Sequence, residues 1–551
     1  MKKNQFYLIA IIAILIISFF IRLELTNKNT EISNSDEAEY LVMADSFSRG
    51  EITFQWPYYR PFLIPLLWGA LLSIGFGFKA IQISLILFSL LTILLIYLIT
   101  KDLFNEKIAI IAVLISAFIP EEILSSTRIL LNGASLALFL LSIYLFQKAY
   151  FKNSKKYLYL SAIATGIAIL AYTQNIILLP LYFAFLLITE GSKFIKEKKY
   201  ITFFIIIILI YLTNFIYSYI WFGNPIKMFS YGLWLSLIDT SSRSYYTVII
   251  DFIKNMSQYI SWFIIIPLIF SIYYLKDYIK EFAKKIIEYL KNIKYKKVVY
   301  ALIIVSIYFI LNLIIQKNLD TTPAHKVFAY GIKTLLTLIT LACLIYIFGD
   351  LFGHTSKFIK NNINLEKNTL LLIWFFVSLL GISKIIGAFQ ARYLLPALIP
   401  LIIYVAQLIT KLSEKKKILK TTFVIIIILG LYVNINSSIN LVNNYHQETG
   451  ERKAGEWIKE NTEENSIIVG SQNIAIAHYS QRIWNYYPVT ESQENTNEAF
   501  ADIVKNIKPN YLILIEKGER NKLIEEYAKN LVYEKRYESE EYNLNLYKIS
   551  S

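Results

Sequence analysis

The chain has 551 residues, 56% of them hydrophobic and 17% charged, with a formal net charge of +15. Its mean hydropathy is +0.48. Apolar segments recur that are long enough for the roughly 20 residues of a transmembrane helix, which excludes an ordinary soluble protein. The single cysteine, Cys343, excludes an intramolecular disulfide, and the four histidines show no metal-ligand spacing. The sequence therefore predicts a polytopic α-helical membrane protein.

The first apolar segment, Phe6 to Ile21, follows Lys2 and Lys3. No small-residue cleavage site follows it, so we interpret it as a membrane anchor with a cytoplasmic N-terminus. Thirteen transmembrane spans are predicted, at about 5–22, 79–100, 107–120, 130–149, 157–172, 175–190, 200–221, 258–275, 298–316, 328–349, 369–387, 393–410 and 420–438.

Lysine distribution predicts the sidedness of these spans. Alternate connections are lysine-rich, as in 148–156, 193–199 and 411–420, whereas the opposite loops hold mostly single arginines. By the positive-inside rule the lysine-rich connections are cytoplasmic and contact lipid headgroups, which explains the positive charge without nucleic acid. A full span at Pro61–Phe78 would invert this pattern, so that run should be a re-entrant or interfacial helix. The expected location is the plasma membrane.

The chain is predicted to divide into a transmembrane catalytic domain, 1–440, and an extracytoplasmic domain, 441–551. The tail carries 18 acidic and 13 basic side chains, unlike the basic remainder. We expect helices at GERKAGEWIKENTEEN and NKLIEEYAKNLVYEKRY, strands at SIIVG and YLILI, and an edge strand at YNLNLYKIS. This alternation is typical of a small α/β domain. The loops 23–78 and 121–129 should face outward like the tail.

The first outward loop contains NSDEAEYLVMADSFSRG, from Asn34 to Gly50, with Asp36 and Glu37 at an apparent helix start. Taken alone, the two acids suit a first turn and its dipole. In a helix, Asp36, Glu39 and Tyr40 would share one face and Glu37 would point about 100° away. The adjacent acids should therefore have different roles.

Further polar residues are expected at the outer face or near it. Glu121 and Glu122 could be an ordinary first helical turn, and Arg128 and Arg392 could be interfacial anchors. Lys384 lies near the end of a span, where a charged side chain usually faces a cavity or a partner. Sugar transfer from a polyprenyl phosphate needs such a set, because a carboxylate must accept the acceptor's proton and cations must stabilise the leaving phosphate.

Several motifs together resemble glycosyltransferases of the GT-C fold, in particular protein O-mannosyltransferases and the aminoarabinose transferases that modify lipid A (glycosyltransferase family 39). These are DEAEYLVMADSFSRG after the first span, then YRPFLIPLL, GNPIKMF, RYLLPALIP, and GEWIKENTEENSIIVG followed by YSQR. The resemblance covers nearly the whole chain. It implies an inverting enzyme with a dolichyl- or undecaprenyl-type phosphate donor and an acceptor in protein, lipid or glycan.

The resemblance also implies roles for individual residues. Asp36 would be the catalytic carboxylate and Glu37 would support the loop or the acceptor. Arg128 would approach the lipid phosphate or the second-loop acids, and Arg392 would bind the phosphate. The remaining residues expected to bind donor or substrate are Tyr40, Arg60, Lys384 and Tyr393.

Two departures from the family pattern bear on metal binding. Asn132 stands where many relatives have an aspartate, and no acid directly precedes Arg60, although Glu51 is nearby. Both argue against a shared metal site, so the sequence does not require a divalent metal, although Glu121 and Glu122 could serve one. The alternatives are a polysaccharide polymerase or ligase that uses lipid-linked sugars, and a lipid or sugar transporter.

Overall fold

A computed structural model describes residues 3–28, 32, 35–50, 60–228, 295–317, 349–385, 391–415, 417–443, 449–470, 474–486, 508–516, 532–538 and 543–549, with isolated positions between them. The α-helices of these ranges are α1 (Lys3–Lys28), α2 (Ser35–Arg49), α3 (Leu63–Ser73), α4 (Phe78–Leu103), α5 (Glu106–Ser116), α6 (Pro120–Thr127), α7 (Leu131–Phe151), α8 (Lys155–Ala171), α9 (Leu178–Glu190), α10 (Lys198–Tyr211), α11 (Thr213–Phe222), α15 (Tyr295–Lys317), α17 (Gly349–Lys360), α18 (Ile363–Ile385), α19 (Leu395–Lys415), α20 (Lys417–Asn443), α21 (Thr449–Asn461) and α22 (Ile474–Ser480). Short 3-10 helices lie at η1 (Thr173–Ile177), η2 (Gly191–Lys196) and η3 (Ala391–Leu394). The strands are β1 (Ile467–Gly470), β2 (Ile483–Tyr486), β3 (Tyr511–Glu516), β4 (Val532–Glu538) and β5 (Asn543–Lys548).

The predicted helical membrane class is confirmed. Within the described ranges, eight helical segments are long and apolar enough to cross a membrane, and the bent pair α5 and α6 would make a ninth. The predicted span 258–275 lies outside the described residues, and so does most of 328–349. The number thirteen therefore stays a prediction.

The exposed surfaces of individual helices fit a membrane protein. On α1, Phe6, Ile9 and Ile16 are more than half exposed although they are large and apolar. Of the most apolar 18-residue segment of α20, only 17% is buried, whereas 83% of the corresponding segment of α19 is buried. Exposed apolar faces of this length are suited to lipid, and α19 is instead an interior helix.

The chain forms two compact units. One contains residues 1–16, 91–122 and 135–436, and the other contains 17–90, 123–134 and 437–551. The second unit thus combines the first predicted outward loop, most of the second and the C-terminal tail, whereas we predicted a boundary at 440 with both loops in the membrane domain.

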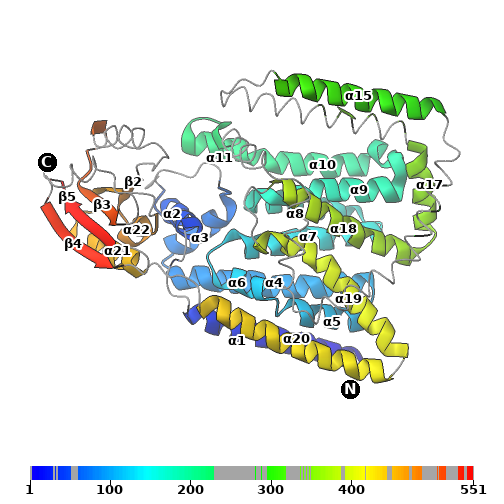
Figure 1. The fold of residues 1–551 in the computed structure, drawn as a ribbon, viewed down its shortest axis with the longest axis horizontal. Coiled ribbons are helices and arrows are strands. Elements are labelled where there is room, and N and C mark those ends of the chain that lie inside the picture. Colours follow the sequence, from blue (N-terminus) through cyan, green and yellow to red (C-terminus); the bar gives the residue numbers. More distant parts are fainter. Residues whose placement is uncertain are drawn as a thin grey trace. The chain divides into compact units, whose positions relative to one another are not determined.

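The first unit, which we call the helical unit, consists of packed apolar helices. In it α8 packs against α10, α9 packs against α17 and α18, and α19 packs against α5 and α18 (Figure 1). Small residues allow this close packing. A Cβ atom on Gly166 of α8 would lie 2.7 Å from the Ile210 side chain of α10.

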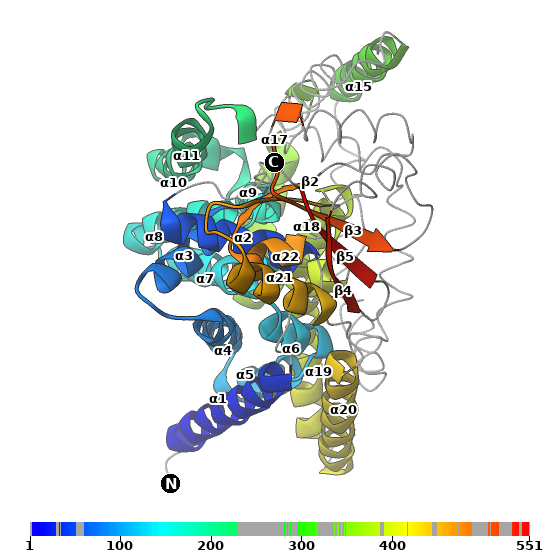
Figure 2. The same ribbon diagram turned by 90° about the vertical axis from the view of Figure 1, so that its left-hand side faces the viewer.

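The second unit, which we call the α/β unit, contains a five-stranded sheet of order β2-β1-β3-β5-β4 (Figure 2). β1 is parallel to β2 and β3, while β5 is antiparallel to β3 and β4. Helix α21 packs against β4, β5 and α22. The strands at SIIVG and YLILI and the first tail helix were predicted correctly.

Two expectations for this sheet are wrong. Residues 532–538, which we expected at the end of a helix, form strand β4. Since β4 pairs with β5, the final strand is not at an edge.

Helix α3 follows Arg60 and lies in the run Pro61–Phe78. Its eleven residues cover about 16 Å, half of a bilayer's hydrocarbon core. This length agrees with the expected re-entrant or interfacial helix. Helix α3 packs closely against α2, because a Cβ atom on Gly69 would lie 2.6 Å from Phe47 Cβ and 2.8 Å from the Ala44 carbonyl oxygen.

Candidate functional site

Helix α2 carries the candidate site. Asp36 and Glu37 occupy its first turn and Arg49 its last turn, both favourable for the helix dipole. Its central residues Leu41, Met43 and Ala44 are fully buried. The helix is therefore held by an apolar core on its central turns and presents its acids at the N-terminal end.

Arg60 gathers three side chains from one face of α2. Its Nη2 donates to Asp36 Oδ1 at 2.5 Å, its Nε donates to Glu39 Oε2, and its Nη1 donates to the Tyr40 hydroxyl at 3.2 Å. The guanidinium carbon lies 5.1 Å from the centre of the Tyr40 ring. The face predicted from helical spacing is thus present, and the planar fork of arginine is what allows one residue to bind both carboxylates.

Solvent access distinguishes the acids of this helix. The side chain of Asp36 is 27% exposed, that of Glu39 12% and that of Arg60 17%. Glu37 is only 2% exposed. Of these three carboxylates, Asp36 is therefore the one that a substrate could reach most readily.

Glu37 points away from this cluster and forms a buried ion pair. Arg128 Nε donates to Glu37 Oε1 at 2.5 Å, and the Arg128 side chain is 1% exposed. The pair joins α2 to the segment after α6, 91 residues along the chain. Arg128 thus contacts a first-loop carboxylate, and its assignment to the lipid phosphate or the second-loop acids stays a prediction.

The C-terminal end of α2 is bound to the tail. His478 Nδ1 and Asp45 Oδ2 are 2.6 Å apart, and Arg49 donates to the Gln481 carbonyl oxygen at 3.3 Å. Just before α2, the Ile32 amide donates to the Tyr479 hydroxyl at 3.0 Å. These contacts, which the sequence did not predict, connect α2 to the tail. The part-buried contacts of Asp45 and Ile32 contribute more to this connection than the exposed hydrogen bond of Arg49.

The other predicted residues lie elsewhere on the chain. Glu121 and Glu122 occupy the first turn of α6 and are largely buried. Arg392 and Tyr393 lie in η3, with the Arg392 guanidinium carbon 5.4 Å from the Tyr393 ring centre. Lys384 lies in the last turn of α18, and its side chain is outside the described residues.

Across the residues that the structure describes, no group of three or more His, Cys, Asp or Glu side chains is arranged to hold a metal ion. Asn132, which stands at the family's aspartate position, is 8% exposed near the start of α7. Whether the enzyme uses a divalent metal therefore stays a question for the sequence, which does not require one.

Comparison with known proteins gives one family match. Residues 59–217 match the family model of dolichyl-phosphate-mannose-protein mannosyltransferases. This range begins beside Arg60 and includes Glu121, Glu122 and Arg128. No curated protein sequence matches the chain significantly.

Solved structures show the fold. The structure of ArnT from Cupriavidus metallidurans bound to undecaprenyl phosphate is 11% identical with a TM-score of 0.53, and the match covers 98% of each chain. ArnT in the apo state is also 11% identical, with a TM-score of 0.50 and coverage of 99% of this chain and 98% of that one. The apo oligosaccharyltransferase of Archaeoglobus fulgidus is 12% identical with a TM-score of 0.50, over 91% of this chain and 69% of that one.

The fold is therefore that of the GT-C membrane glycosyltransferases, and it extends over almost the entire chain. The mannosyltransferase model matches residues 59–217, and together with this fold it supports a glycosyltransferase activity for the chain.

Proposed function

We propose that this enzyme transfers a sugar from a polyprenyl phosphate to an acceptor hydroxyl at the outer face of the plasma membrane. The observation that carries the proposal is the Arg60 cluster, in which Asp36 is both fixed by a guanidinium and more exposed than its neighbouring acids. ArnT, which shares the fold, was solved with undecaprenyl phosphate. The donor class proposed for the present chain follows from that likeness and from the family match.

In this reaction Asp36 acts as a general base. Its carboxylate accepts the proton of the acceptor hydroxyl as the hydroxyl oxygen attacks the anomeric carbon. The bond between that carbon and the phosphate oxygen breaks, and the electron pair leaves with the lipid phosphate. Attack opposite to the leaving group inverts the anomeric configuration. Arg60 holds the base in position, and Arg392 is proposed to bind the phosphate.

The experiment that tests the function combines binding with turnover. The purified enzyme should retain a polyprenyl phosphate in native mass spectra and should transfer its sugar to an acceptor with inversion at the anomeric carbon. Retention of configuration would contradict the single-displacement mechanism. Absence of both lipid binding and transfer, tested with dolichyl and undecaprenyl donors, would contradict the proposal.

Arg392 offers a test of phosphate binding. Arg392→Ala should weaken binding of the polyprenyl-phosphate donor by about 10- to 100-fold, the range expected for a hydrogen bond to a charged group. Arg392→Lys should weaken it less, because only the fork geometry is lost and the charge remains. Donor titration by native mass spectrometry measures both. If the alanine variant binds as well as the wild type, Arg392 is an interfacial anchor.

The proposed sidedness can be tested with single cysteines in a Cys343→Ser background. Glu463→Cys, an exposed position after α21, should react with an impermeant maleimide in intact cells. Lys156→Cys, an exposed position at the start of α8, is the matched control and should react only after lysis. The reverse labelling pattern would overturn the predicted topology and the outward location of Asp36.

A further inference from the structure

The helical unit contains a cavity that is separate from the residues of α2. It has a volume of about 460 Å³ and is lined from the C-terminal ends of α7, α9 and α17 and the N-terminal ends of α8, α10 and α18. These ends belong to three lysine-rich connections, 148–156, 190–199 and 357–367, all predicted to be cytoplasmic. Connections far apart in the sequence thus meet around one cavity, as expected of loops on one membrane side.

Three lysines line this cavity, which we call the lysine pocket: Lys155, Lys199 and Lys360. Lys360 Nζ is 2.5 Å from Glu190 Oε2. The other carboxylate in the lining, Glu366, accepts a hydrogen bond of 2.6 Å from the Tyr150 hydroxyl. Both acids of the pocket therefore already have a donor within the protein.

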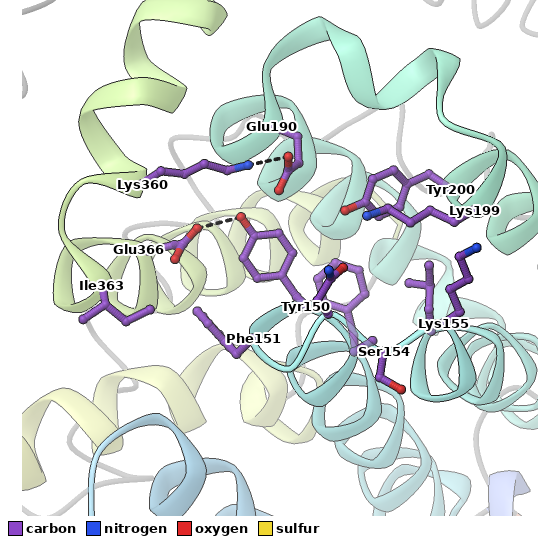
Figure 3. A pocket seen from close by; sticks show the side chains of 14 residues that line it. Tyr150, Phe151, Ser154, Lys155, Glu190, Lys199, Tyr200, Lys360, Ile363 and Glu366 are labelled. Carbon is purple, nitrogen blue, oxygen red and sulfur yellow. Dashed lines mark hydrogen bonds and ion pairs between the residues drawn. The ribbon is translucent and has the colours of Figure 1, made fainter.

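The remaining positive charge comes from Lys155 and Lys199. Lys155 forms no ion pair with any described residue, and Lys199 lies 3.2 Å from Glu197, which does not line the pocket. Figure 3 shows the polar ends of Lys199 and Tyr200 directed into the cavity toward Glu190. The lining thus carries three ammonium groups and two carboxylates, a net charge of +1, together with hydroxyl groups. Ammonium and hydroxyl groups are donors that can bind a phosphate group.

Apolar side chains also line the cavity. Ile363 is exposed and Phe151 is half-buried, whereas Phe146 and Leu158 are almost fully buried. A soluble anion makes no favourable contact with apolar side chains. A lipid does, because its glycerol and upper acyl chain lie beside its phosphate. Basic pockets between transmembrane helices on the cytoplasmic side are known to bind lipid headgroups. The combination of lysines and apolar wall at the ends of spans favours a lipid over free phosphate.

We propose that the lysine pocket binds the phosphodiester headgroup of an anionic membrane phospholipid, with Lys155 and Lys199 as the phosphate ligands. The connections that line the pocket are predicted to be cytoplasmic, whereas the loop with Asp36 is predicted to be extracytoplasmic. The occupant of the pocket is therefore neither the sugar donor nor the acceptor of the proposed reaction.

The test is a native mass spectrometry titration of the delipidated full-length protein with phosphatidylglycerol and, separately, phosphatidylcholine. The wild type should bind phosphatidylglycerol preferentially. In Lys155→Gln/Lys199→Gln the affinity for phosphatidylglycerol should fall at least about tenfold, since each lysine near the membrane surface contributes on the order of a fivefold factor. Transfer activity is not measured, so failure of the proposed reaction leaves this test intact.

The matched control is Lys152→Gln/Lys156→Gln, which removes the same charge from exposed neighbours that do not line the pocket. It should change the affinity by less than about twofold. Equal losses in both double variants would mean general surface attraction and overturn the site, as would equal binding of the two lipids. If the double variant misfolds, the single variant Lys155→Gln, at an exposed position, replaces it in the titration. Displacement of phosphatidylglycerol by millimolar inorganic phosphate would assign the pocket to a soluble phosphate and overturn the lipid.

Discussion

Replacing Asp36 with Asn should reduce single-turnover sugar transfer by about 10²- to 10⁴-fold, the usual cost of removing a general base. Asparagine has the same shape and still fits the first turn of α2. The substitution also weakens a dipole interaction of about 0.3–1 kcal/mol and removes one charged partner of Arg60. Thermal stability and donor binding, measured on the same samples, should therefore change little.

Glu39→Gln is the matched control for this experiment. It also removes one carboxylate from Arg60, but the base that we propose remains in place. If Asp36 only positions Arg60, the two variants should lose activity to a similar extent. If Asp36 is the base, Glu39→Gln should keep most of the activity. If the transfer rate of Asp36→Asn is within about threefold of the wild-type rate, Asp36 is not the base, and its carboxylate only stabilises the helix N-terminus and pairs with Arg60.

The periodic features of this molecule could be predicted from the sequence because they are local. Hydropathy and lysine distribution predicted the membrane class. The 3.6-residue period of a helix placed Asp36, Glu39 and Tyr40 on one face, and all three contact Arg60. The partners themselves could not be predicted, because Arg60 is 24 residues from Asp36 and Arg128 is 91 residues from Glu37. Such pairings are decided by tertiary packing.

The two errors in the tail have one origin. The run NKLIEEYAKNLVYEKRY reads as helical in isolation, but its last part pairs with the final strand. Strand preference depends strongly on cross-strand neighbours such as Tyr547, whose ring centre lies 5.6 Å from that of Tyr533. Because β4 was missed, β5 was taken for an edge. The interior position of β5 could not be predicted without β4, its neighbour in the sheet.

The second large effect concerns the buried pair of Glu37 and Arg128. Arg128→Met or Glu37→Gln alone should destabilise the protein by roughly 3–5 kcal/mol. Each substitution removes one charge of the pair and leaves the opposite charge buried away from water without that partner. The helical wheel shows only that the Glu37 side chain points away from the acid cluster; it does not show what buries that side chain. Its burial against Arg128 changes the expectation from activity to stability.

The double variant Glu37→Gln/Arg128→Met separates structural pairing from phosphate binding. If the two residues serve mainly each other, it should recover much of the loss in thermal unfolding, since replacing a whole buried ion pair is often nearly neutral. Arg49→Met, on the exposed end of the same helix, is the control and should cost less than about 0.5 kcal/mol. If Arg128 instead binds the lipid phosphate, donor affinity should fall in Arg128→Met, stay normal in Glu37→Gln and fail to recover in the double variant. Recovery of stability with unchanged donor affinity would assign Arg128 to holding α2, and with it Asp36, in place.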